Sequence, residues 1–125
     1  MAKSCNIDML DAALDWVINN TNIMHLCSAE PVNYTQASVT YSLGSVVIAG
    51  GDFTGPAYGD VSGRKITVGA KIDIPITGDG DVTHVVLCDT GSSKLVYVQT
   101  CTLEVVTTGN LTQTSAWDIE LRNPT

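Results

Sequence analysis

The sequence predicts a mainly β protein, either an antiparallel β-sandwich or a partial barrel of about eight strands, with one N-terminal α-helix. After residue 22 the chain is rich in Val, Ile and Thr, whose branched side chains favour strands. Short apolar runs in this region are separated by Gly, Asp and Asn turn signals. The helix–strand alternation of a doubly wound parallel sheet is missing from the pattern, so that fold is not expected.

The length of 125 residues predicts a single domain spanning 1–125. We expect an N-terminal arm over 1–6, a helix over 7–19 and a β domain over 22–122. Apolar residues make up 44% of the chain and charged residues 15%, a composition that argues against intrinsic disorder.

An apolar stripe with helical spacing predicts the helix over 7–19. Asn6 precedes the stripe as an N-cap, and Trp16 widens it, so Trp16 is expected in the core. The stripe consists of Ile7, Leu10, Leu14, Val17 and Ile18. Three aspartates lie opposite the stripe and are expected to face solvent: Asp8, Asp11 and Asp15.

The predicted strands follow one another closely, as in an antiparallel sheet. They are 22–28, 39–49, 64–70, 71–77, 82–89, 94–101, 102–107 and 115–122. The clearest unit is the hairpin around Gly91, in which Asp89 opposite Lys94 would set Leu87 opposite Val96. This register separates Cys88 from Cys101 by several residue rises, too far for a disulfide bond.

Residues 50–65 are expected to form a long loop, because they contain five glycines, one proline and few apolar residues. Ordered long loops are often contact surfaces. Phe53 and Tyr58 could anchor this loop either to its own core or to a neighbouring molecule, and we take both as candidate interface residues.

The four cysteines are Cys5, Cys27, Cys88 and Cys101, and no two have the C-x-x-C spacing of zinc or redox motifs. Buried free thiols are therefore expected. Cys5 differs because it lies in the polar arm, where it could form a bond between subunits, so it is a third candidate interface residue.

No catalytic, cofactor-binding or metal-binding residues are predicted, and we do not expect an enzyme. His25 and His84 could serve as bases, but no nucleophile motif accompanies them. His25 shares a strand face with Cys27, as His84 does with Cys88, although all four could not easily converge on one zinc ion. Acidic turns such as the one containing Asp79 and Asp81 lack the ligand series of an EF-hand, and turn geometry explains them.

The net charge of −7 disfavours binding to nucleic acid, which depends on clustered Lys and Arg. No apolar run is long enough for a secretory signal or a membrane span, since aspartates interrupt the N-terminal segment. We therefore expect a protein made in a cytoplasm, with no membrane partner.

The whole-chain pattern resembles small virion-associated structural proteins of tailed bacteriophages and prophages. The segments that carry the resemblance are 10–15 (LDAALD), 27–31 (CSAEP), 59–65 (GDVSGRK), 83–87 (THVVL) and 117–121 (WDIEL). The resemblance implies a location in the virion and brings no catalytic residues with it.

Two classes of function follow from the resemblance. The first is a virion structural protein, such as a capsid decoration or cement protein, that forms a homo-oligomer, for example a trimer, and contacts the major capsid protein or other virion proteins. A neck, collar or fibre-attachment subunit would fit equally. The second is a glycan- or receptor-binding module of the virion, for which Tyr34, Tyr41 and Tyr58 are candidates.

Overall fold

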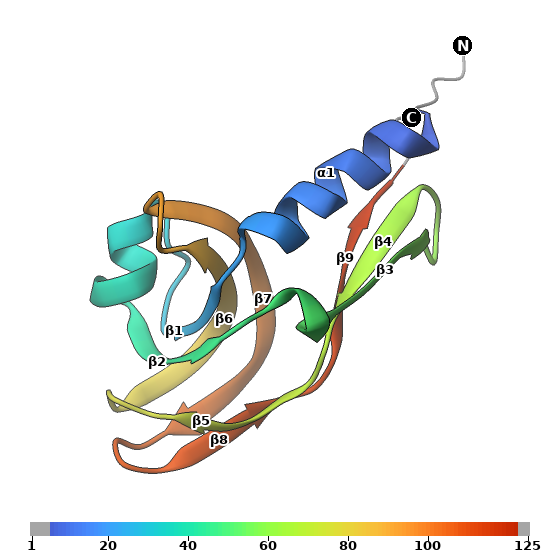
Figure 1. The fold of residues 1–125 in the computed structure, drawn as a ribbon. Helices are drawn as coiled ribbons and strands as arrows, with labels where there is room; N and C mark the ends of the chain where they lie inside the picture. Colours follow the sequence, from blue (N-terminus) through green and yellow to red (C-terminus); the bar gives the residue numbers. More distant parts are fainter. Residues whose placement is uncertain (1–5, 123–125) are drawn as a thin grey trace.

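The structure, a computed structural model, describes residues 6–122 and confirms the predicted class, a mainly β fold with antiparallel sheets and an N-terminal helix (Figure 1). The elements in chain order are α1 (Ile7–Asn20), β1 (Ile23–Cys27), η1 (Gln36–Thr40), β2 (Ser42–Val47), η2 (Gly50–Asp52), β3 (Phe53–Tyr58), β4 (Arg64–Val68), β5 (Lys71–Pro75), β6 (Gly80–Asp89), β7 (Lys94–Val106), β8 (Leu111–Thr114) and β9 (Trp117–Leu121). Among them, η1 is a π-helix and η2 a 3₁₀ turn.

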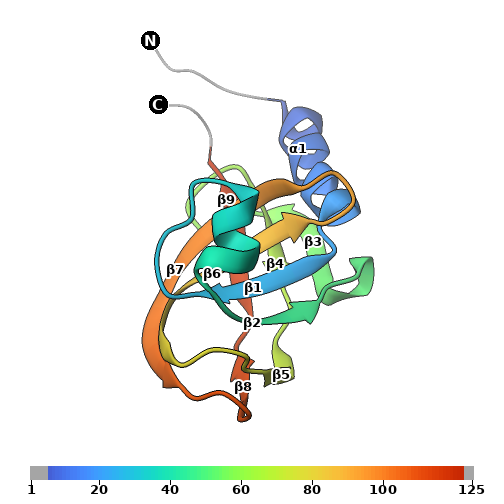
Figure 2. The same ribbon diagram turned by 90° about the vertical axis from the view of Figure 1, so that its left-hand side faces the viewer.

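The strands form a partial barrel with one open side (Figures 1 and 2). One sheet has the order β2-β1-β6-β7, a second β3-β4-β9, and a third pairs β5 with β8. Because β5 directly follows β4 and β9 directly follows β8, the last two sheets form one bent ribbon. A bridge between Gly44 and Ile76 joins this ribbon to β2, while β7 pairs only with β6 among the described strands. The barrel is therefore open between β7 and β8–β9.

Helix α1 agrees with its predicted range to within one residue and begins as expected. The Asn6 side chain accepts a hydrogen bond from the Asp8 amide at 2.7 Å, which satisfies one of the free N–H groups of the first turn. Leu10 and Leu14 are buried against β3 and β4, and Val17 packs at the edge of the same core. The predicted apolar stripe thus docks the helix on the sheet.

Two expectations about the helix are wrong. Trp16 is 46% exposed instead of lying in the core, because the contact stripe of the helix is narrower than its apolar surface. Asp11 does not simply face solvent, since it forms an ion pair with Arg64 at 2.7 Å.

The predicted loop over 50–65 is also wrong. It contains η2 and strand β3, which pairs with β4 on both sides of an irregularity between Thr54 and Ala57. The glycine and proline inside β3 lower its apparent strand propensity, but antiparallel pairing with β4 overrides that preference. What remains irregular is the turn at 59–63.

Three further boundaries differ from the prediction. Strand β2 begins at Ser42 instead of residue 39, because side-chain hydrogen bonds of Asn33 and Gln36 cap the turns that lead into η1. Strand β7 is continuous where two strands were expected, and β8 was not predicted at all.

The β6–β7 hairpin has the predicted register only next to its turn. Asp89 pairs with Lys94 as expected, and its carboxylate accepts hydrogen bonds from the Gly91 amide and the Ser92 hydroxyl. Beyond a register shift at Leu87, every pairing is displaced from the predicted one. Bulges of this kind insert a residue that strand alternation does not reveal.

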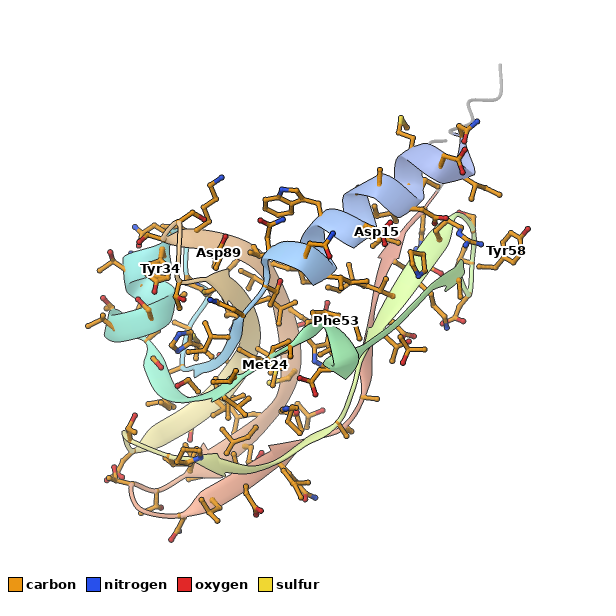
Figure 3. All side chains as sticks on the ribbon, in the orientation of Figure 1. Asp15, Met24, Tyr34, Phe53, Tyr58 and Asp89 are labelled. Atoms are coloured by element: carbon orange, nitrogen blue, oxygen red, sulfur yellow. The ribbon has the colours of Figure 1, made fainter. Side chains whose placement is uncertain are left out.

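Buried side chains form two clusters on opposite faces of the four-stranded sheet. The larger lies inside the barrel, where Met24 is fully buried (Figure 3). The smaller lies under η1 and contains Cys27, Ala37, Val86 and Cys88. Both cysteines in it are free and fully buried, which confirms the expectation of buried thiols for these two.

Burial fixes the ionisation of the smaller cluster. It raises the pKa of Cys27 to about 12 and that of Cys88 to about 11, so both thiols are protonated at neutral pH. The Cys27 Sγ donates to the Ala37 carbonyl at 3.4 Å, which ties η1 to β1. Cys101 is also free but only half-buried, and no disulfide joins it to Cys88.

We predict that His25 makes the stability of the fold depend on pH. Burial lowers the pKa of His25 below its ordinary value of 6.5. The unfolded chain therefore takes up a proton first as the pH falls through 6.5, and the free energy of unfolding should drop by up to about 1.4 kcal/mol per pH unit until the folded pKa is reached. Above 6.5 this contribution is fully present.

Urea unfolding between about pH 8 and about pH 5 would measure this dependence. The His25→Asn variant should show a flatter profile than the wild type, because asparagine keeps a polar group near Ser42 but does not titrate. Parallel profiles for the two proteins would contradict the assignment.

Candidate protein contact surface

The most exposed aromatic ring among the described residues is Tyr58, which lies at the end of β3. Its side chain is 74% exposed and points away from the molecule at the far end of the β3–β4 hairpin (Figure 3). The Arg64 guanidinium lies 4.8 Å from the centre of the Tyr58 ring. A cation over an aromatic face is attracted by the ring's negative face, so this contact favours one position of the exposed ring.

Arg64 is itself held by the helix. Its Nε donates to Asp11 Oδ1 at 2.7 Å and its Nη2 to Asp11 Oδ2 at 3.3 Å, a two-pronged contact between residues far apart in sequence. The same Nη2 also donates to the Pro56 carbonyl at 3.4 Å. The Asp11 carboxylate raises the pKa of Arg64 further, so the guanidinium stays charged. Helix α1, β3 and β4 thus converge on the base of Tyr58.

The turn beyond Tyr58 is fixed from both sides. The Gly59 amide donates to the Gly63 carbonyl at 3.0 Å and closes the turn. Glu120 of β9 accepts from the Val61 amide at 3.1 Å and from Arg122 Nε at 2.7 Å, and these bonds lower the pKa of Glu120. The tip of the hairpin is therefore an ordered part of the fold.

The charged side chains beneath the turn largely neutralise one another. Lys65 Nζ contacts Asp60 at 2.7 Å and Asp118 at 3.5 Å, and the first of these contacts raises the pKa of Lys65 most. These charges are therefore paired within the chain, although Asp60 remains largely exposed.

Apolar side chains are exposed around the same end. Val61 in the turn is 69% exposed. Ile7 is also exposed, and it lies one helical turn before Asp11. We call the set of Ile7, Tyr58 and Val61 the Tyr58 surface.

The other candidate interface residues have different positions. Phe53 is partly buried and packs against the main core, so it anchors β3 to its own sheet, the first of the two roles considered for it. Cys5 lies outside the described residues. Of the three, only Tyr58 is described as presenting a largely exposed side chain.

The three tyrosines considered for glycan binding are not gathered in one place. Tyr34 and Tyr41 pack against the smaller buried cluster beside η1. Tyr58 lies at the opposite end of the molecule (Figure 3). A stacking platform built from these three rings therefore does not form.

The structure brings His25 next to Ser42, a pair that the sequence did not suggest. His25 Nδ1 lies 2.9 Å from Ser42 Oγ on the neighbouring strand, the distance of a nucleophile–base pair. The pair is shielded, since His25 is only 6% exposed, and within residues 6–122 no carboxylate forms a hydrogen bond with the imidazole. Its evident role is to satisfy a buried imidazole.

The histidines and cysteines considered as zinc ligands lie on one face of the four-stranded sheet but do not form a metal site. Cys27 pairs directly with His84 across β1 and β6, so these two side chains share a sheet face with His25. In the part of the chain that the structure describes, no three His, Cys, Asp or Glu side chains are placed to hold a metal ion. Asp79, one of the acidic turn residues, instead accepts from the Thr108 amide at 2.7 Å.

Comparison of the chain with protein-family models, curated proteins and solved structures finds no match. No helix within residues 6–122 has the length and apolar character needed to cross a membrane.

Proposed function

We propose that this chain is a structural protein of a bacteriophage virion, a capsid decoration or cement subunit that acts through protein–protein contacts. Its partners would be other copies of itself, in a small ring such as a trimer, and the major capsid protein. The proposal starts from the resemblance in the sequence and requires a contact surface but no active site. Assembly into the virion would follow synthesis in the host cytoplasm.

The observation that supports this function best is the rigid base of Tyr58. Binding hot spots are enriched in Tyr, Trp and Arg, and ordering a side chain before binding reduces the entropy lost on association. Tyr58 meets both conditions, because Arg64 holds its ring and Asp11 holds Arg64. The surrounding apolar side chains would complete the contact and exclude water.

Replacing Tyr58 with alanine is expected to weaken self-association of the chain by at least about tenfold, because the largest exposed ring of the surface is lost. Sedimentation velocity of the full chain up to about 100 µM would give the dissociation constant. The matched control is Val39→Ala on η1, at the opposite end of the molecule (Figure 1), because Val39 is 72% exposed.

Equal loss of association in both variants would indicate a general effect and contradict a role for Tyr58. A wild-type chain that is monomeric throughout this range would overturn the self-assembly part of the proposal. The virion part has its own test, mass spectrometry of gradient-purified particles. Absence of the chain from those particles would overturn it even if the chain oligomerises.

Cryo-electron microscopy of the same particles would distinguish a decoration subunit from a neck, collar or fibre-attachment subunit. Density over the capsid lattice is the expected result. Density confined to one vertex would contradict the decoration role and favour one of these alternatives. The Tyr58 surface serves all of these positions, since each needs a rigid apolar contact.

A further inference from the structure

A cleft of about 410 Å³ lies on the open side of the barrel. A tight turn, closed by a hydrogen bond from the Asn110 amide to the Thr107 carbonyl, connects β7 to β8. Away from this turn the two strands diverge and do not pair. One wall of the cleft comes from β7 at Gln99–Glu104 and the other from Gln113–Trp117. Its volume falls in the range of small-molecule sites.

The floor of the cleft is apolar and belongs to the main core. Leu26, Val82 and Val85 reach it from the inner face of the four-stranded sheet. Trp117 lines the cleft, and its ring stacks on Tyr97 with ring centres 6.1 Å apart. This stacking supports the indole from one side, so the cleft has an aromatic side chain in its wall.

The walls of the cleft carry uncharged polar groups that both donate and accept hydrogen bonds. Glu104 is the one carboxylate among the lining residues, and Thr112 Oγ1 donates to it at 2.7 Å. No Lys, Arg or His is among the described residues that line the cleft, so it offers no cation to a phosphate or other anion. The polar lining residues are Gln99, Thr100, Thr102, Glu104, Gln113, Thr114 and Ser115.

Two lining residues have polar atoms whose hydrogen-bonding capacity is unused. Trp117 Nε1 and Thr114 Oγ1 are both buried, and neither has a hydrogen-bond partner in the described structure. Buried donors without partners are rare in folded proteins. A polar ligand that draws these side chains toward it would satisfy both.

We propose that this cleft binds a neutral saccharide. A pyranose ring has an apolar face that can lie on Trp117 and hydroxyls that donate and accept, as the amides and hydroxyls of the walls require. A peptide strand is the competing occupant, because the outer edge of β7 is unpaired. The side chains favour the saccharide, since seven of the twelve lining residues are polar.

The proposal is independent of the assembly role. Trp117 pairs with Val68, whereas Tyr58 pairs with Arg64 at the other end of β4. Saccharide binding can therefore be tested with the Tyr58 surface removed, and either proposal can fail without the other.

The test uses the full chain with the substitution Trp16→Phe, which leaves Trp117 as its single tryptophan. Methyl glucoside, methyl galactoside and methyl N-acetylglucosaminide would be titrated separately to about 50 mM, enough for a weak millimolar ligand. We expect at least one to shift Trp117 emission in a saturable way. The same sugar should slow alkylation of Cys101, which lines the cleft, relative to its rate without sugar, as read by peptide mass spectrometry.

Variants then locate the site. Gln113→Ala and Glu104→Ala should each raise the dissociation constant at least about fivefold, because each removes a polar partner, while Tyr58→Ala should leave it unchanged. Thermal unfolding would establish that the variants are folded. The proposal is overturned if no sugar shifts the emission, if both cleft variants bind as the wild type does, or if the peptide acetyl-Thr-Val-Thr-Val-amide shifts Trp117 where the sugars do not.

Discussion

Replacing Gly63 with alanine is expected to lower the free energy of unfolding by about 3 kcal/mol or more. Gly63 has a positive φ of 69°, which alanine adopts only with strain. A Cβ at this position would also overlap the carbonyl oxygen of Leu121 and lie 2.9 Å from its carbonyl carbon, so β9 would have to move. Urea unfolding of the variant and the wild type would measure the difference.

The control for this prediction is Gly50→Ala. A Cβ at Gly50 meets no atom within 4 Å and its φ is not positive, so its stability should change by less than about 0.5 kcal/mol. The Gly63→Asn variant separates the two causes, since asparagine tolerates positive φ but has the same Cβ. If the overlap dominates, Gly63→Asn is as unstable as Gly63→Ala. If Gly63→Ala lowered the free energy of unfolding by less than about 1 kcal/mol, the prediction would be wrong, because β9 would then be able to shift away from the added Cβ at little cost.

The course of the chain at Gly63 also explains why the sequence did not predict this region as a strand pair. A strand pattern is recognised from branched side chains and alternation, and β3 offers Gly55 and Pro56 instead. Its pairing with β4 and the close approach of β9 at Gly63 are long-range effects that residues 50–65 do not encode by themselves. The turn was visible as glycines, but the strand before it was not.

The helix, in contrast to β3, is predicted well from local signals. Its N-cap, its periodicity and its end all lie within residues 6–21, so its range was predicted to within one residue. Which of its apolar side chains meets the sheet depends on the docking angle, which no local pattern contains. For that reason Leu14 was placed correctly in the core and Trp16 was not.

For the Tyr58 surface, too, the sequence predicts one part and only the folded chain shows the other. Tyr58 was predicted as a contact residue from its glycine-rich surroundings, and it is exposed. What supports its ring is Arg64, which is held by Asp11, a residue 53 positions away. Opposite charges at that separation have many possible partners, so the pair could be found only in the folded chain. The cleft was missed for a related reason, since its walls come from strands that diverge.

The side chain that fixes the helix to the sheet is Leu14, and truncating it should have the second large effect. Leu14 is fully buried, so Leu14→Ala removes apolar contacts and leaves a cavity between α1 and the β3–β4 sheet. Such substitutions cost about 2–5 kcal/mol. Thermal or urea unfolding would measure the loss.

The matched control lies on the same helix. Met9 is 56% exposed, so Met9→Ala should change stability by less than about 0.5 kcal/mol, while the helix propensity changes little because alanine is the best helix former. If both variants lost the same stability, the helix would contribute through its backbone and not through the packing of Leu14. A large loss confined to Leu14→Ala would mean that the packing of the buried stripe holds the helix on the sheet. The same docking keeps Asp11 next to Arg64, which lies against the Tyr58 ring.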